Sequence, residues 1–166
     1  MRSDAQLVCH GRALDRRRAA LALVLGGLSL PAAATLGEGY ASIDTDARGA
    51  QIVWRSQQTR GEVTVHLLAL ASGTQVRELV DNHGRVFAVA WQGTAVPDLR
   101  QLLGVAFRTV VAAAQTPHGG HHQLVFTRDD LVYRAQGTQR FLRGSAWLIS
   151  RLPAGLTAVT LEQMLR

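Results

Sequence analysis

The stretch from Pro97 to Gln115 constrains the fold most, because its apolar residues recur with the period of an α-helix. Pro97 suits the first helical position, since its missing N–H needs no partner there, and Asp98 in the first turn favours the positive end of the helix dipole. Pro117 blocks continuation of the helix. We therefore expect one long amphipathic helix over about 97–115. Its apolar stripe follows the i, i+3, i+4, i+7 spacing and consists of Leu99, Leu102, Leu103, Ala106, Phe107, Val110, Val111 and Ala114.

The segments before this helix have the period and composition of β-strands. In 62–71, apolar Val63, Val65, Leu67 and Ala69 alternate with Glu62, Thr64 and His66, which predicts a half-buried strand with the second set on its polar face. Turn residues follow at 72–74 and 81–84, where Gly84 suits a positive φ. Extended segments are expected at 75–80 and 85–91, with weaker signals for a short helix at 41–48 and a short strand at 51–56.

The segments after the helix indicate three more strands, at 123–127, 131–135 and 140–150, separated by turns at 128–130 and 136–138. A short helix is expected to begin near Thr157. Strands grouped on both sides of one long helix predict a single small α+β domain. In it, antiparallel meander strands flank the helix, which packs on one face of their sheet.

The N-terminal segment has the layout of a secretory signal peptide. Arg16 to Arg18 precede an uncharged apolar run at 19–30 and the small-residue stretch PAAAT. The run has 12 residues, whereas a membrane-spanning helix needs about 20, so no permanent membrane anchor is expected. We expect residues 1–34 to be removed and 35–166 to form the mature domain, periplasmic or secreted. The general secretory route is favoured over the twin-arginine route, since no Ser or Thr directly precedes the arginines.

Removal of this segment lowers the charge of the protein. The full chain has a formal net charge of +6, and 13 arginines with 10 acidic residues remain in 35–166, a net charge of +3. These arginines are scattered in sequence, and we interpret them as part of a solvated surface. They form no basic stripe with interleaved aromatic residues, so nucleic acid is not an expected partner. The single cysteine, Cys9, lies in the removed segment, which excludes a disulfide, a thiolate nucleophile and a cysteine-ligated metal in the mature domain.

Three stretches together resemble the bacterial exported family called domain of unknown function 2844. They are "SGTQVRELVDNHGRVFAVAWQGTAVPDLRQLLG" (72–104), "RDDLVYRAQGTQRFLRGSAWL" (128–148) and "LPAGL" (152–156), behind a signal peptide. The join between FAVAW and PDLRQLLG is the most specific part. The chain departs from the family pattern at Gly93-Thr94, where Gly-Pro is expected, and this loosens one turn. The resemblance implies no established activity, cofactor or catalytic residue.

Three histidines, His118, His121 and His122, lie close together in TPHGGHHQL. Neutral imidazole is a good ligand for zinc, copper or nickel, so these three residues are the candidate metal ligands. The spacing does not match a helical HExxH site, and adjacent His121 and His122 would point to opposite sides at the start of a strand. Ordering a glycine-rich loop also costs about 1–2 kcal/mol per residue. A solvated loop between helix and strand is therefore favoured, and no metal or other cofactor is expected.

No local catalytic signature stands out. Ser145 lies in Gly144-Ser145-Ala146 rather than in a G-x-S-x-G elbow, and Asp129-Asp130 is more simply a turn than a catalytic pair. Nucleotide-binding and haem-attachment motifs are absent from the sequence. Trp91 and Trp147 end apolar strands and are expected in the core, the alternative for the tryptophans being an aromatic platform for a ligand. No catalytic residue is predicted, and an enzyme is not expected.

The sequence favours a small exported binding or accessory module whose partner is an unidentified protein or envelope component. Two alternatives remain open. One is a hydrolase with a site assembled from distant residues, and the other is a structural or assembly protein of the cell envelope. Neither the ligand nor the oligomeric state follows from the residues.

Overall fold

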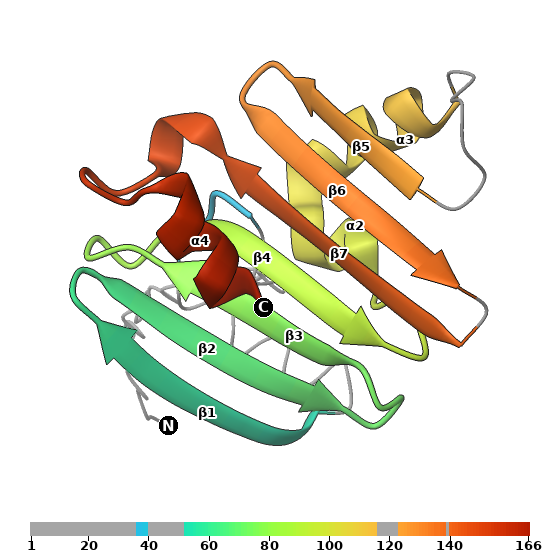
Figure 1. The fold of residues 1–166 in the computed structure, drawn as a ribbon, viewed down its shortest axis with the longest axis horizontal. Helices are drawn as coiled ribbons and strands as arrows, with labels where there is room; N and C mark the ends of the chain where they lie inside the picture. The colour runs from blue at the N-terminus through green and yellow to red at the C-terminus, as the bar shows by residue number, and fades with distance from the viewer. Residues whose placement is uncertain (1–35, 40–51, 116–122, 139) are drawn as a thin grey trace, which may run out of the picture.

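The computed structural model describes residues 36–39, 52–115, 123–138 and 140–166. In this part of the chain seven strands form one antiparallel sheet of order β1-β2-β3-β4-β7-β6-β5 (Figure 1). The first four strands meander across half of the sheet, and the last three meander back from the far edge until β7 pairs with β4. The strands are β1 (Ile52–Arg60), β2 (Val63–Leu70), β3 (Gln75–Val80), β4 (Val86–Gly93), β5 (Gln123–Arg128), β6 (Leu131–Thr138) and β7 (Phe141–Leu148). The predicted α+β class is confirmed.

The helical segment lies where the apolar stripe predicts it, between the two groups of strands. It comprises α2 (Leu99–Leu103), the 3-10 turn η2 (Gly104–Ala106) and α3 (Phe107–Ala114). Asp98 is the N-cap and Pro97 lies outside the helix. The Asp98 carboxylate accepts from the backbone N–H groups of Arg100 and Gln101, at 2.9 and 3.2 Å. A side-chain acceptor at this position satisfies N–H groups that have no partner within the helix.

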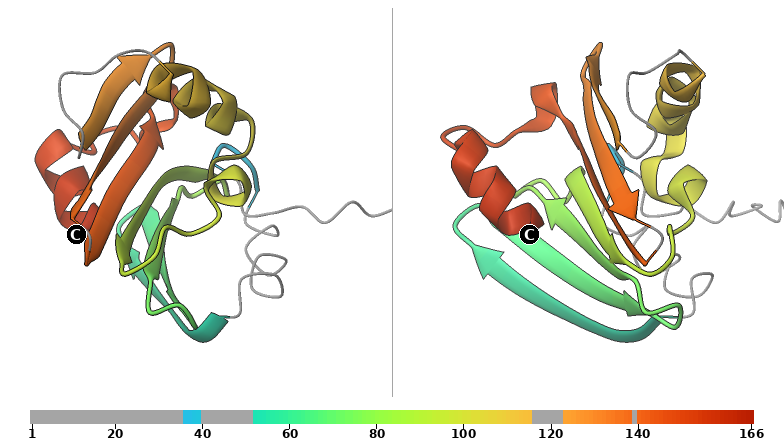
Figure 2. Two further views of the ribbon diagram at one scale, coloured as in Figure 1. Left: turned by 90° about the vertical axis from the view of Figure 1, so that its right-hand side faces the viewer. Right: turned by 45° about the vertical axis from the view of Figure 1, so that its right-hand side comes forward.

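Helices cover both faces of the strongly twisted sheet (Figures 1 and 2). The α2–α3 segment lies behind the sheet in Figure 1, and α4 (Ala158–Leu165) lies in front. Thr157 caps α4 by accepting from the Thr160 N–H at 3.2 Å, which confirms the expected start of this helix; η3 (Ile149–Arg151) precedes it. Among the described residues, no helix is long and apolar enough to cross a bilayer.

Each face of the sheet has its own apolar core. The face under α2–α3 buries Trp91 and Tyr133, each 3% exposed, and the expected core position of Trp91 is confirmed. The face under α4 buries Phe87 and Trp147 against Leu161 of that helix. Because β4 is the central strand, its apolar residues are buried on both faces.

Three local predictions are wrong, and one is the placement of Pro97 at the first helical position, because Asp98 is the N-cap and the helix begins after it. The turn expected at 136–138 does not form, because β6 continues through Thr138 and pairs with β7 along its whole length. Gly137 has a different role there, since a Cβ at this position would overlap the side chain of Leu142 on the neighbouring strand. His66 is not on an exposed polar face but buried, because both faces of β2 are covered. The helix expected at 41–48 lies outside the described residues.

Candidate functional site

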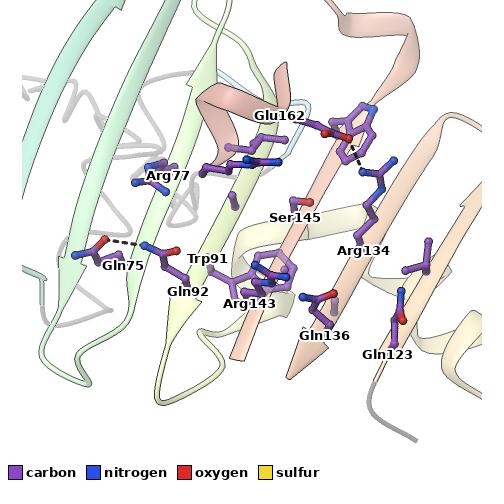
Figure 3. A pocket seen from close by; sticks show the side chains of 17 residues that line it. Gln75, Arg77, Trp91, Gln92, Gln123, Arg134, Gln136, Arg143, Ser145 and Glu162 are labelled. Carbon is purple, nitrogen blue, oxygen red and sulfur yellow. Dashed lines mark hydrogen bonds and ion pairs between the residues drawn. The ribbon is translucent and has the colours of Figure 1, made fainter. Parts of the chain in front are cut away.

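A groove of about 730 Å³ lies on the α4 face of the sheet, beside the last turn of that helix (Figure 3). Strands β3 to β7 form its floor, and Glu162 and Leu165 of α4 form part of its wall. The face changes character here, from the apolar core under α4 to a polar surface. The polar residues that line the groove are Gln75, Arg77, Gln92, Gln123, Arg134, Gln136, Arg143, Ser145, Glu162 and Arg166.

One row of side chains crosses the groove floor at right angles to the strands. Residues directly opposite each other in neighbouring antiparallel strands share a face, so strand register alone defines the row. Neighbouring strands lie about 4.8 Å apart, and four such spacings give a row about 19 Å long. We call it the amide row, and it runs in register through Gln75, Gln92, Arg143, Gln136 and Gln123 (Figure 3).

Hydrogen bonds within the amide row hold its members in place. Gln92 Nε2 donates to Gln75 Oε1 at 3.2 Å. When the Gln136 carboxamide is oriented with its oxygen toward Arg143, that oxygen accepts from the Nε and Nη2 groups of the guanidinium. A carboxamide carries two N–H donors and one oxygen with two lone pairs, so each glutamine of the row keeps at least one N–H donor for a ligand beyond these bonds. The row is thus partly preorganised and rich in hydrogen-bonding groups.

A second row lies two residues along each strand on the same face. It runs in register from Arg77 through Ala90 and Ser145 to Arg134 and then Val125. The two central residues are small, whereas the flanking residues Arg77 and Arg134 are long. This arrangement hollows the middle of the floor and places one cation on each side of it.

The groove carries an excess of positive charge. The side chains of its described lining residues include four guanidinium groups and one carboxylate, that of Glu162. Arg134 Nη1 contacts Glu162 Oε1 at 2.8 Å, and its guanidinium lies 5.0 Å from the ring centre of Trp147. This ion pair and cation–π contact occupy Arg134, leaving Arg77, Arg143 and Arg166 to determine the charge that the groove presents.

Arg77 is the cation in the least favourable position. It is half-buried, and this burial lowers the pKa of its guanidinium. Within the described ranges, no carboxylate forms an ion pair with it. An arginine keeps its charge in proteins, so a bound anion is the direct way to compensate this desolvated cation.

Ser145, which was considered as a nucleophile, lies on the groove floor, whereas Asp130 does not line the groove. His118, His121 and His122 lie outside the described residues. Within the described part, no group of three or more His, Cys, Asp or Glu side chains is placed to hold a metal ion. Asp130 belongs to the predicted β5–β6 turn and accepts from the Ser150 N–H and Oγ, at 2.7 and 2.5 Å.

Two buried ionisable side chains were not expected from the strand pattern. His66 of β2 and Glu78 of β3 pair in register and are 6% and 1% exposed. They point to the α2–α3 face, since Arg77 and Leu79 on either side of Glu78 point to the α4 face. These groups lie across the sheet from the groove and take no part in it.

The amide row itself was not predicted from the sequence. The arginines are scattered in sequence, but the sheet brings Arg77, Arg134 and Arg143 to one groove. A signal was present in each strand, where polar Gln75, Gln92 and Arg143 alternate with apolar neighbours. Such alternation predicts that a strand has a polar face, but it does not predict which strands will pair and place their polar faces side by side.

Comparison with known proteins identifies the family. No curated protein and no solved structure matches the chain. The profile of the family described as "Protein of unknown function (DUF2844)" matches residues 32–161. The match covers all seven strands and the α2–α3 segment, and it agrees with the resemblance seen in the sequence. The chain belongs to the DUF2844 family.

Proposed function

We propose that this protein is an exported, non-enzymatic binding module that holds an anionic ligand in the groove beside α4. The observation that carries the proposal is Arg77, a half-buried guanidinium with no ion-pair partner in the described part of the chain, beside the amide row. Guanidinium groups form short, charge-assisted hydrogen bonds to carboxylate and phosphate oxygens. A ligand with such a group would compensate the charge that the fold leaves exposed to the groove.

The composition of the groove favours binding over hydrolysis. A hydrolase needs a nucleophile with an adjacent base, or two carboxylates on either side of the scissile bond. Among the described lining side chains, Glu162 has the one carboxylate, and this group is ion-paired with Arg134. Ser145 lies on the floor, but no described histidine lines the groove with it. Amide and guanidinium groups recognise ligands well and are poor general bases.

The N-terminal segment supports export to the periplasm or the medium, with an envelope component as the source of the ligand. The basic residues and apolar run before Ala34 have the signal-peptide layout. Leu36 is 2% exposed, and its N–H donates to the Leu102 carbonyl at 3.2 Å. Cleavage after Ala34 would therefore leave this core residue in the mature protein.

Calorimetric titration at low ionic strength tests the proposal with three kinds of anion: inorganic phosphate, oligoglutamate and an acidic oligosaccharide. We expect at least one kind to bind, with Arg77→Gln and Arg143→Gln each weakening it roughly tenfold. Arg151→Gln removes an exposed arginine outside the groove and serves as the matched control. If none of the three anions binds, or if the groove variants behave like the control, the proposal is wrong.

A further inference from the structure

We infer that the ligand of this groove is an acidic oligosaccharide that lies along the amide row, across the strands of the sheet. The inference rests on the proposed function, because it names the class of anion that the same site takes. It draws on the chemistry of the row, its repeat distance, the number of cations and an exposed tryptophan in line with it.

The chemistry of the amide row suits a hydroxylated ligand. Four of its five members are glutamines, whose planar carboxamides donate and accept side by side. Neighbouring hydroxyl groups of a sugar offer the same pairing of donor and acceptor. A row of near-identical groups fits a ligand that repeats, such as an oligosaccharide, better than a small irregular molecule.

The repeat distance separates a sugar chain from a peptide. Members of the amide row recur at the strand spacing of about 4.8 Å, which is close to the length of one sugar residue. An extended peptide repeats at about 3.3 Å per residue and loses register with the row after two positions. Peptides also add to sheets at an edge strand through their backbone groups, whereas this groove lies on a face.

The number of cations suits a chain that carries acid groups at intervals. Arg143 lies within the row, and Arg77 lies two residues along its strand from Gln75, about 7 Å away. Carboxylates spaced along a sugar chain match the two arginines, while the hydroxyl groups meet the amides.

Trp54 extends the same line toward the edge of the sheet. It pairs in register with Ala69, which pairs with Gln75, so the three residues share a face. Trp54 is 52% exposed, although tryptophan is highly buried on average in proteins. The C–H face of a sugar ring packs well on an exposed indole. A longer oligosaccharide would thus reach from the amide row to Trp54.

Calorimetry on the purified protein tests the inference with oligogalacturonate and oligomannuronate of increasing length. The comparison probes are the fully methyl-esterified oligogalacturonate, which is neutral, and oligoglutamate of equal charge. We expect the two acidic sugars to bind at least tenfold more tightly than either comparison probe, with affinity rising with length. Trp54→Ala should remove the gain from added length and leave binding of the shortest oligomer unchanged.

Amide variants separate recognition of hydroxyl groups from attraction of charge. Gln92→Ala combined with Gln136→Ala should weaken oligogalacturonate roughly tenfold and leave any binding of oligoglutamate unchanged. Gln57→Ala is the matched control, because Gln57 pairs with His66 and therefore lies on the opposite face. Thermal unfolding of each variant verifies that it is folded.

The outcomes distinguish the inference from the proposed function. Oligoglutamate or phosphate binding as tightly as the acidic sugars, with loss in Arg77→Gln, overturns the inference and leaves the proposed function standing. Equal affinity for the methyl ester also overturns the inference, since the acid groups of the sugar would then contribute nothing to binding. If no anionic probe binds, both are wrong.

Discussion

The two faces of one sheet differ in what they do, although they are built from the same strands. On the α2–α3 face, the side chains of Val89, Trp91 and Tyr133 form a closed apolar core. On the α4 face, Gln92 follows Trp91 in sequence and pairs in register with Arg143, and both side chains line a groove. Alternating residues of the same strands therefore belong either to the apolar core or to the proposed binding groove.

The difference between the faces follows from the length of the helices that cover them. The α2–α3 segment spans 99–114, whereas α4 has 8 residues and is about 12 Å long. Under α4 the sheet presents Leu79, Phe87 and Trp147, and beyond its last turn the same face becomes polar. Because α4 is short, part of this face stays uncovered and forms the groove.

Neighbouring residues of β4 give the sharpest test of this division. Trp91→Ala removes a 3%-exposed indole from the α2–α3 core and should lower the free energy of unfolding by about 3–5 kcal/mol. Gln92→Ala, one residue along, should lower it by less than about 0.5 kcal/mol and weaken ligand binding instead. Urea unfolding of both variants measures this contrast. Similar decreases in the free energy of unfolding would mean that residues on both faces contribute equally to stability, and would contradict the division.

The closed face should also govern stability at high pH. Burial raises the pKa of Tyr133 to about 12, from an unfolded value near 10. Below pH 10 the phenol is neutral in both states, and between pH 10 and 12 only the unfolded state ionises appreciably. The contribution of buried Tyr133 to the free energy of unfolding is therefore complete below pH 10. It decreases as the pH rises, and the loss reaches about 2–3 kcal/mol at pH 12. Tyr133→Phe should flatten this fall in unfolding experiments, and an unchanged profile would show that another group titrates.

A second pair of neighbours on β7 tests the division at smaller scale. A Cβ added at Gly144 would overlap the indole ring of Trp91, so Gly144→Ala should destabilise the protein by about 1–3 kcal/mol. Ser145→Ala faces the groove and should change stability by less than about 0.5 kcal/mol. Thermal unfolding compares the two. A tolerated Gly144→Ala would show that the core under α2–α3 has room to relax.

Much of the fold follows from periodicity that lies within short segments. The apolar stripe from Leu99 to Ala114 defines the helix, and Thr157 marks the start of α4, because caps and stripes are local signals. Gly84 has the positive φ, 74°, that its predicted turn requires. These elements depend on residues that are neighbours in sequence, and sequence reasoning therefore finds them.

The groove depends on pairings between strands that are distant in sequence. Gln92 and Arg143 meet because β7 returns to pair with β4, and no local pattern predicts that order. Gln136 could not be assigned to a strand from the sequence for another reason, because the adjacent Gly137 suggests a turn. In the structure, the missing side chain of Gly137 leaves space for the side chain of Leu142. The alternation of polar and apolar residues within each strand could be predicted from the sequence. The strand order that places the polar residues of five strands on one surface could not.

The smallest expected effect on stability tests whether the polar face is tuned for a ligand. Glu162→Gln breaks an ion pair whose side chains are 45% and 48% exposed, so the free energy of unfolding should change by less than about 1 kcal/mol. Affinity for oligogalacturonate should rise several-fold, because Arg134 is released and the groove loses its described side-chain carboxylate.

Asp129→Asn is the matched control, since it removes one negative charge at a turn with a φ of 53° that asparagine tolerates. Titrations at several salt concentrations should show a gain for Glu162→Gln alone that salt diminishes. Equal gains in both variants would mean that the net charge of the protein, and not the groove, attracts the anion.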